Sequence, residues 1–302
     1  MALTFVNLQD HVLDMIDVDD ADTRTYVKAY INMSGRDIWK AYPWYERRVE
    51  GSLTTVAPYS TGTVSSSGAT ITGSGTTFPA GTAAGLARFA KSFADPFYTV
   101  TTRDSATQLT LADSYAEAPL SGATYVLFQD VYELASTVDT VVDLRLIKAQ
   151  DHGPLDGVLE RRLDEAVYIP GQSGTPWSWA LVSPNPTTKV KRVRLWPVPD
   201  AVYRVKYRAL TDYTDMTADG DECVVPESRR DLLITGALRW AYRLKDEDAK
   251  ADAAEVRFQQ LLQMHWRRER AQAPLAARLG RYDRAGWRGR ADFGADDLTV
   301  PS

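Results

Sequence analysis

The sequence predicts an α+β fold: an antiparallel helical host domain with a β-hairpin, an inserted small antiparallel β-barrel or sandwich, and an extended C-terminal arm. Three observations lead to this prediction. Apolar residues recur at helical spacing in residues 226–270, β-branched residues alternate in residues 54–129, and hydrophobic periodicity fades beyond Arg270. The expected boundaries are 1–50 and 131–270 for the helical host domain, 51–130 for the insert and 271–302 for the arm.

Two amphipathic helices are predicted in residues 226–270. Pro226 suits the first turn of the first helix, because the N–H that proline lacks would have no intrahelical partner there. The apolar face of this helix consists of Leu233, Ala237, Trp240, Ala241 and Leu244. The second helix begins after Lys245 with acidic capping residues and then an apolar face: Asp246, Glu247 and Asp248, followed by Ala254, Phe258, Leu261 and Leu262. We expect an antiparallel pair whose open faces something else must cover.

The N-terminal residues predict two more helices. A short one carries the apolar residues Leu8, Val12, Leu13 and Ile16, and a longer one runs from residue 23 to about residue 42 and stops at Pro43. The aspartates between them are Asp17, Asp19, Asp20 and Asp22. Because their spacing lacks the glycine and the distal glutamate of a calcium loop, we expect a solvated turn with Asp22 as the helix cap. The aromatic cluster Trp39, Tyr42, Trp44 and Tyr45 is expected to seal a core rather than stack on a ligand.

The insert is rich in Thr, Ser, Gly and Ala, and its short alternating runs predict antiparallel strands. These runs are residues 61–64, 69–78, 98–102, 108–111 and 123–128. The glycines Gly73 and Gly75 are expected in a hairpin turn, since no lysine follows them as a phosphate-binding loop requires.

After the insert, the chain is expected to return to the core as a strand over residues 138–146 and then form a short helix within residues 156–167. Two further strands, residues 190–196 and 202–209, flank a Pro/Asp turn and predict a hairpin. Strict alternation gives this hairpin one apolar face and one basic face. The basic residues are Arg192, Arg194, Arg204, Lys206 and Arg208.

The last residues cannot bury a core of their own, so they are expected to be disordered or to fold on a partner. Basic residues alternate there with apolar and aromatic ones: Arg278, Leu279, Arg281, Tyr282, Arg284, Trp287, Arg288, Arg290 and Phe293. Contact with nucleic acid and docking in an acidic protein groove both fit this composition. We favour the protein groove.

Composition and motifs argue against an enzyme. The histidines His11, His152 and His265 show no paired metal-ligand spacing, and the single cysteine, Cys223, lies among acidic residues that disfavour a thiolate. Glu160 and Asp164 lie one helical turn apart, but neighbouring arginines make an ordinary charged helix face the better interpretation. We expect no catalytic residue, cofactor or metal. The net charge of −5 predicts weak binding of free DNA, and no secretory signal or membrane span is recognised.

The order of these parts resembles the head-to-tail adaptor, or connector, proteins of tailed bacteriophages. The resemblance covers residues 1–48 and 131–270. It rests on the motifs Trp39…Tyr42-Pro-Trp, Val131-Tyr-Glu-Leu, Gly174-Thr-Pro, Leu195-Trp-Pro-Val-Pro-Asp and Val225-Pro-Glu. The insert is similar to modules of phage tail and connector proteins, whereas the arginine-rich tail has no counterpart that matches residue by residue.

This resemblance implies a structural virion protein of the head-tail neck, assembled in the host cytoplasm. Copies would form a homo-oligomeric ring, expected to be a dodecamer, that docks beneath the portal protein and continues the DNA channel. Genomic DNA would pass without sequence recognition, and no membrane is involved. The C-terminal arm would reach the portal, and the basic hairpin would face the channel or the downstream tail, or nozzle, protein.

Two alternatives stay open at this point. The first is a tail-associated protein whose insert binds or degrades a cell-surface glycan. A glycan-active site needs clustered carboxylates, but those in the insert are scattered: Asp95, Asp104, Asp113 and Glu117. The second is a cellular scaffold unrelated to phage, which neighbouring genes for a portal and a terminase would argue against.

Overall fold

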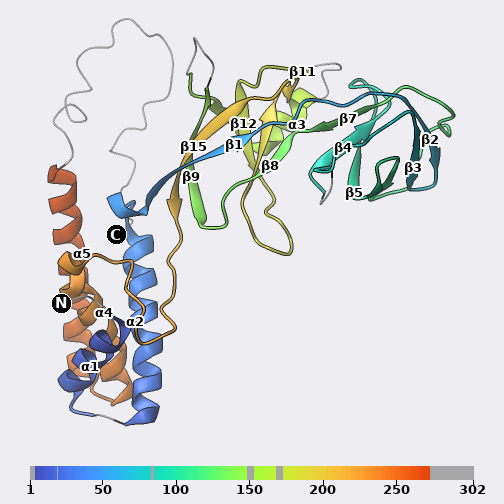
Figure 1. The fold of residues 1–302 in the computed structure, drawn as a ribbon. Coiled ribbons are helices and arrows are strands. Elements are labelled where there is room, and N and C mark those ends of the chain that lie inside the picture. The colour runs from blue at the N-terminus through green and yellow to red at the C-terminus, as the bar shows by residue number, and fades with distance from the viewer. Residues whose placement is uncertain (1–3, 19, 83–84, 148–152, 168–172, 273–302) are drawn as a thin grey trace, which may run out of the picture. The chain divides into compact units, whose positions relative to one another are not determined.

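The computed structural model describes residues 4–18, 20–82, 85–147, 153–167 and 173–272 (Figure 1). The fold is α+β, with helices and mainly antiparallel sheets, as the sequence predicted. The chain divides into two compact units, one made of residues 1–38 and 215–302 and the other of residues 39–214. Each unit is described separately below.

The first unit is helical, and it contains the predicted antiparallel pair α4 (Arg230–Leu244) and α5 (Asp248–Gln272). A turn at residues 245–247 joins the two helices. Ala237 and Ala241 on α4 and Phe258 on α5 are almost fully buried. Leu244 is 40% exposed, so the prediction that it lies on the buried face of α4 was wrong. The start of α4 also differs from the prediction. Pro226 precedes a short 3-10 helix, Glu227–Arg229, and the α-helix begins only after it.

Helices α1 (Phe5–Ile16) and α2 (Ala21–Ala41) complete the core of this unit, α2 through its residues up to Ile38. The apolar residues predicted on α1 are buried, and the Ser34 hydroxyl on α2 donates to the Leu233 carbonyl of α4 at 3.1 Å. Gly236 allows this close approach, because a Cβ there would collide with Ser34 Oγ and with the Phe258 ring. Part of the apolar surface of the helical pair is therefore covered within the same chain.

Asp20, in the turn between α1 and α2, caps the N-terminus of α2. The prediction that Asp22 is the cap was wrong. The backbone N–H of Thr23 donates to Asp20 Oδ1 at 2.8 Å, and the Thr23 hydroxyl donates to Asp20 Oδ2 at 2.7 Å. These bonds from Thr23 lower the pKa of the Asp20 carboxyl. Asp22 already lies in the first turn of α2, one position past the start of the helix.

The second unit contains a three-stranded antiparallel sheet in the order β1 (Arg48–Thr54), β15 (Arg204–Thr211), β9 (Val138–Ile147). A four-stranded sheet follows in the order β10 (Asp156–Gly157), β12 (Ser178–Val182), β13 (Arg192–Trp196), β8 (Val131–Glu133). Strands β11 (Ser173–Gly174) and β14 (Val198–Pro199) form a small parallel pair, and α3 spans Glu160–Val167. Buried residues of both larger sheets share one core, which includes Leu144, Val193, Leu195 and Val205.

The predicted hairpin of residues 190–209 does not form. Strand β13 pairs with β12 and β8, whereas β15 pairs with β1 and β9, so the two strands belong to different sheets. The segment between β13 and β15 includes β14, which pairs with β11. This segment therefore does not form the tight turn that would pair β15 with β13. Alternation predicted both strands correctly but not their partners, because it specifies faces and leaves pairing open.

The insert forms a six-stranded antiparallel sheet in the order β2, β3, β6, β5, β4, β7. Its strands are β2 (Thr63–Ser67), β3 (Thr70–Ser74), β4 (Ala87–Ala90), β5 (Tyr98–Ser105), β6 (Gln108–Leu111) and β7 (Val126–Gln129). The sheet curls on itself, since Val64 of β2 bridges Ala123 just before β7. Phe78, Phe89 and Leu109 fill its interior. The prediction missed only β4 among these strands.

A buried ion network lies where this curled sheet meets the rest of the second unit. Asp130, between β7 and β8, is 2% exposed and accepts from Arg194 Nε of β13 at 2.8 Å and from Arg88 Nε of β4 at 3.4 Å. Arg194 also donates to Asp164 of α3 at 2.8 Å. Beside these charges, Phe128, Leu163 and Trp196 belong to one apolar cluster.

Candidate functional site

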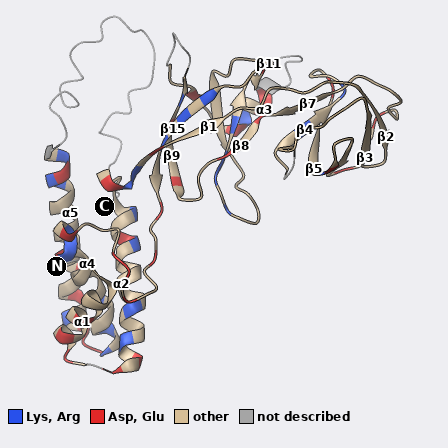
Figure 2. Ribbon diagram, viewed as in Figure 1, with Lys and Arg blue, Asp and Glu red and all other residues tan. Residues whose placement is uncertain are grey.

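The outer face of the three-stranded sheet carries most of the described residues that the sequence singled out. Along β15, Arg204, Lys206 and Arg208 are exposed, and Val205 and Tyr207 between them are buried. Figure 2 marks the lysine and arginines of this strand in blue. For β15, the predicted division into an apolar and a basic face is therefore confirmed.

The register of the sheet places charges from three strands in one row. Glu50 of β1 and Asp143 of β9 are the cross-strand partners of Arg208. Arg208 Nε lies 3.2 Å from Glu50 Oε1, and Arg208 Nη1 lies 3.9 Å from Asp143 Oδ2. Arg145 also reaches Asp143 Oδ2, at 3.4 Å. Because these side chains are partly exposed, each ion pair contributes at most about 1 kcal/mol to the free energy of unfolding. The main effect of the pairs is to orient the Arg208 side chain between Glu50 and Asp143.

The next two rows carry unneutralised positive charge. Lys206 lies opposite Ser52 and Arg145, and Arg204 lies opposite Thr54 and Ile147. No carboxylate in the described part of the chain lies within ion-pair distance of Lys206 or Arg204. This end of the face can therefore accept an acidic partner.

Two hollows on this face form what we call the sheet groove. The larger has a volume of about 690 Å³ and is lined by Pro43, Tyr45, Arg48, Val49, Glu50, Val142, Asp143, Arg208, Ala209 and Leu210. The smaller has a volume of about 390 Å³ and is lined by Glu50, Asp143, Arg145, Leu146, Ile147, Lys206, Tyr207 and Arg208. Both hollows are bordered by the ion-paired row of Glu50, Arg208 and Asp143.

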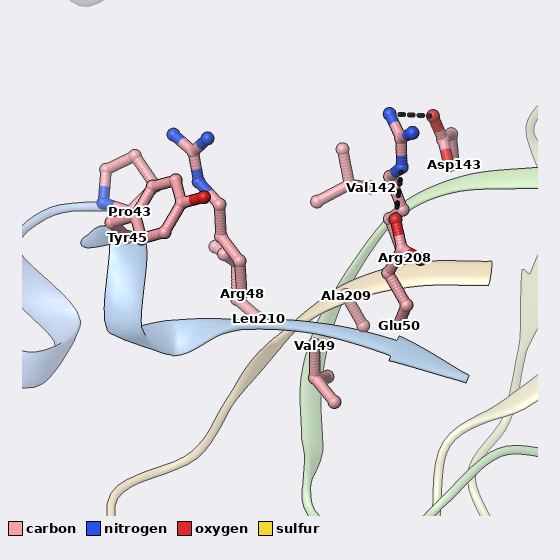
Figure 3. Close-up of a pocket in the computed structure, with 10 residues that line it drawn as sticks. All are labelled: Pro43, Tyr45, Arg48, Val49, Glu50, Val142, Asp143, Arg208, Ala209 and Leu210. Atoms are coloured by element: carbon pink, nitrogen blue, oxygen red, sulfur yellow. Dashed lines mark hydrogen bonds and ion pairs between the residues drawn. The ribbon is translucent and has the colours of Figure 1, made fainter. Parts of the chain in front are cut away.

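The two ends of the sheet groove differ in chemistry. Figure 3 shows Pro43, Tyr45 and Arg48 on one side of the larger hollow and Val142, Asp143 and Arg208 on the other. Tyr45 is 71% exposed and Val142 is 58% exposed, so this end presents apolar surface to solvent. The other end presents the cations of β15. An extended peptide with acidic residues at one end and apolar residues at the other would match both.

Only three of the five basic residues predicted on one face lie together. Arg192 donates to Glu133 Oε1 from Nε at 3.0 Å and from Nη2 at 2.8 Å. Hydrogen bonds from Asn185 and Arg192 lower the pKa of the Glu133 carboxyl, although partial burial opposes them. Arg194 is 7% exposed and lies in the ion network around Asp130. The prediction that these two arginines share a free basic surface with Arg204 was wrong.

The prediction missed the contribution of β1. Arg48, Glu50, Ser52 and Thr54 alternate along this strand with less exposed residues, and this alternation was a signal in the sequence. The change in composition at residue 51 obscures this signal, because it suggests that the insert begins there. The aromatic cluster also divides: Trp39 and Trp44 are buried, whereas Tyr45 lies at the rim of the sheet groove.

Two of the other candidate residues, His265 and Asp164, are engaged in separate ion pairs. His265 Nε2 lies 3.1 Å from Asp231 Oδ1 in the helical unit, and Asp164 is engaged by Arg194. Among the described residues, no group of three or more His, Cys, Asp or Glu side chains is arranged to hold a metal ion. None of the described helices is long and apolar enough to cross a membrane. The nine arm residues from Arg278 to Phe293 lie outside the described residues.

One family model, described as SU10 adaptor protein, matches residues 82–278 of the chain. The match covers more than half of the sequence. It includes the second half of the insert, strands β9 and β15 of the sheet groove, and helices α4 and α5. No curated protein matches the chain.

Proposed function

Because the chain belongs to the SU10 adaptor protein family, a family of structural phage adaptors, we propose that it is the head-to-tail adaptor of a tailed bacteriophage. In this role it docks beneath the portal, continues the DNA channel and recruits the next tail component. The family match over residues 82–278 is the observation that carries the proposal. It places the protein in the virion as a structural component.

The ring is part of this proposal. Identical copies that use two different surfaces on each molecule make head-to-tail contacts, and these contacts close into a ring when the rotation between copies permits. A dodecamer is the expected size. The helical unit, which has buried residues on α1, α2, α4 and α5, supplies a folded body for such contacts.

Two surfaces are assigned to other partners. The arm of residues 271–302 is proposed to bind the portal through its arginines and aromatic residues, because arginine binds carboxylates in two places at once. The face carrying Arg204, Lys206 and Arg208 is proposed to meet the downstream tail protein or to line the channel. Arg192 and Arg194 are not part of this surface, since carboxylates of the same chain already pair with them.

Co-sedimentation with purified portal rings tests the proposal. The intact protein is expected to sediment with the portal, and a variant that lacks residues 273–302 is expected to keep its helical circular dichroism and to stay in the supernatant. A truncated protein that still sediments with the portal would refute the arm assignment. An intact protein that never sediments with the portal would refute the adaptor role itself.

DNA binding provides a second test. The net charge of −5 predicts weak binding of free duplex DNA by the intact protein. Tight binding that weakens steeply as salt rises would instead favour a nucleic-acid-binding role, since such a slope reports the number of phosphates neutralised.

A further inference from the structure

We propose that the free edge of β1 pairs with the same edge of a second copy of this chain, so that two three-stranded sheets join into one. The proposal does not rest on the proposed function, and it concerns a two-fold contact that differs from the head-to-tail contacts of a ring. It starts from the position of β1, which is an outer strand of its sheet and pairs with β15 alone among the described strands. An outer strand presents unpaired N–H and C=O groups that can bind another strand.

Hydrogen bonding identifies the residues of β1 whose backbone groups face outward. The Thr55 N–H donates to the Tyr203 carbonyl at 2.9 Å. In an antiparallel pair, residues that bond to the partner strand alternate with residues whose N–H and C=O point away from it. Counting back from Thr55, the residues whose backbone groups point away from β15 are Arg48, Glu50, Ser52 and Thr54. Within the described residues, no strand pairs with β1 on that side.

Strand β1 lacks the features that protect an outer strand from pairing. Its seven residues pair with β15 in continuous register and include no proline. Its charged side chains are engaged within the chain: the Arg48 guanidinium lies over the Tyr45 ring, 5.3 Å from its centre, and Glu50 pairs with Arg208. The opposite outer strand, β9, is protected. Its register with β15 shifts at two places, and the Leu155 N–H donates to one of its carbonyls at 2.8 Å.

One register of β1 with a second β1 uses all of the outward-facing groups. Antiparallel strands related by a two-fold axis at Gly51 place Arg48 opposite the partner's Thr54 and Glu50 opposite the partner's Ser52. Each of these pairs joins two outward-facing residues, so each can exchange two backbone hydrogen bonds. Only a polypeptide strand supplies this alternation of N–H and C=O groups.

The side chains on the exposed face favour this register over its neighbours. The Ser52 hydroxyl can donate to the partner's Glu50 carboxylate, and like charges do not lie directly opposite each other. An axis at Glu50 would instead place the two Glu50 carboxylates opposite each other. An axis at Val49 would pair Arg48 with the partner's Glu50, but it would overlap the strands only over residues 48–50.

The core-facing side of β1 also suits a second copy. Figure 3 shows Val49 on the opposite side of β1 from Arg48 and Glu50. With the axis at Gly51, Val49 lies opposite the partner's Leu53, and both residues pack against the core shared by the two larger sheets. The pairing would therefore extend this core across the axis.

The test compares substitutions at Ser52 in the full-length protein. Sedimentation equilibrium over a range of protein concentrations measures the dissociation constant of the pair. Ser52→Glu places a carboxylate opposite the partner's Glu50, and the two-fold axis repeats this repulsion, so the dissociation constant should rise roughly tenfold. Ser52→Lys places a cation there and should lower the constant. Because residue 52 lies opposite Lys206 of its own chain, Ser52→Lys is the less favourable of the two for folding, so misfolding cannot produce this order.

A charge exchange and a matched control complete the set. Glu50→Lys combined with Ser52→Glu should recover the affinity lost in Ser52→Glu alone, because opposite charges again face each other across the axis. The control is Thr140→Glu, which adds the same charge at an exposed position of β9, the opposite outer strand of the same sheet. It should leave the dissociation constant unchanged. Circular dichroism confirms that each variant is folded.

Hydrogen exchange followed by mass spectrometry locates the contact. Amide hydrogens of residues 48–54 should exchange more slowly as protein concentration rises, whereas exchange in residues 138–143 of β9 should not depend on concentration. The proposal is overturned if the protein sediments as single copies up to its solubility limit, or if Ser52→Glu and Ser52→Lys shift the dissociation constant in the same direction. Rings that form while residues 48–54 stay unprotected would agree with the adaptor role and overturn this contact.

Discussion

Removing the Asp130 carboxylate should destabilise the second unit more than any substitution on its exposed faces. Asp130 is 2% exposed, and it is the closest buried partner of Arg194, with Oδ2 and Nε 2.8 Å apart. In Asp130→Ala, the carboxylate that remains paired with the buried guanidinium within the described residues is that of Asp164, whose side chain is 55% exposed. Breaking a buried ion pair from one side costs about 3–5 kcal/mol, because the remaining charge is left without its partner in a poorly solvated site.

Urea unfolding followed by tryptophan fluorescence measures this loss. With a slope of about 2–3 kcal/mol per M, the expected cost lowers the urea midpoint of the transition by about 1–2.5 M. Asp164→Ala is the matched control: it removes the exposed partner of the same arginine, and its expected cost is about 1 kcal/mol or less.

The double variant Asp130→Ala with Arg194→Met tests the reasoning further. An apolar side chain of similar length removes the buried charge, so the double variant should be more stable than Asp130→Ala alone. If the free energy of unfolding of Asp130→Ala lies within about 1 kcal/mol of that of the unchanged protein, the Asp130–Arg194 pair does not stabilise the fold as argued. If the double variant is no more stable than Asp130→Ala, the unpaired charge of Arg194 is not the cause of the destabilisation.

Two further predictions concern other sites. Gly236→Ala should destabilise the helical unit by about 1–3 kcal/mol through overpacking. Gly220→Ala is the control, because a Cβ there would meet nothing within 4 Å, and it should change the unfolding midpoint little. Equal effects of the two substitutions would contradict the close packing of the helices. Hydrogen bonds from Asn185 and Arg192 lower the pKa of Glu133 below the usual range of a glutamate carboxyl, so its charge stabilises the fold at neutral pH and this contribution is lost as pH falls through the lowered pKa. Glu133→Gln should therefore unfold at a lower urea concentration than the unchanged protein at pH 7, and this difference should shrink as pH falls into the acid range; a difference that stays constant as pH falls would argue against the ion pair.

Helical periodicity predicted much of the helical unit. Buried residues on α1, α4 and α5 recur at the spacing that one helical face requires, and these contacts are largely local in sequence. What the spacing could not predict is that Ser34, some two hundred residues from Gly236, provides the surface against which α4 packs. The partner of an apolar face is set by tertiary packing that the pattern of one segment does not contain.

The β-strands show the same limit more sharply. Alternation identified β13 and β15, but their neighbours β1, β8, β9 and β12 come from distant parts of the chain. Arg194 illustrates the consequence: its place in the alternation predicted an exposed cation, whereas Asp130 and Asp164 make its burial possible. The sheet groove could be predicted only in part, since it requires the register of three strands.

Electron microscopy of the protein mixed with its portal tests the central claim most directly. If the chain is a head-to-tail adaptor, the images will show a closed circle of copies stacked coaxially on the portal ring. Images that show single copies of the protein beside unoccupied portal rings, even with the protein in large excess over the portal, would contradict that claim.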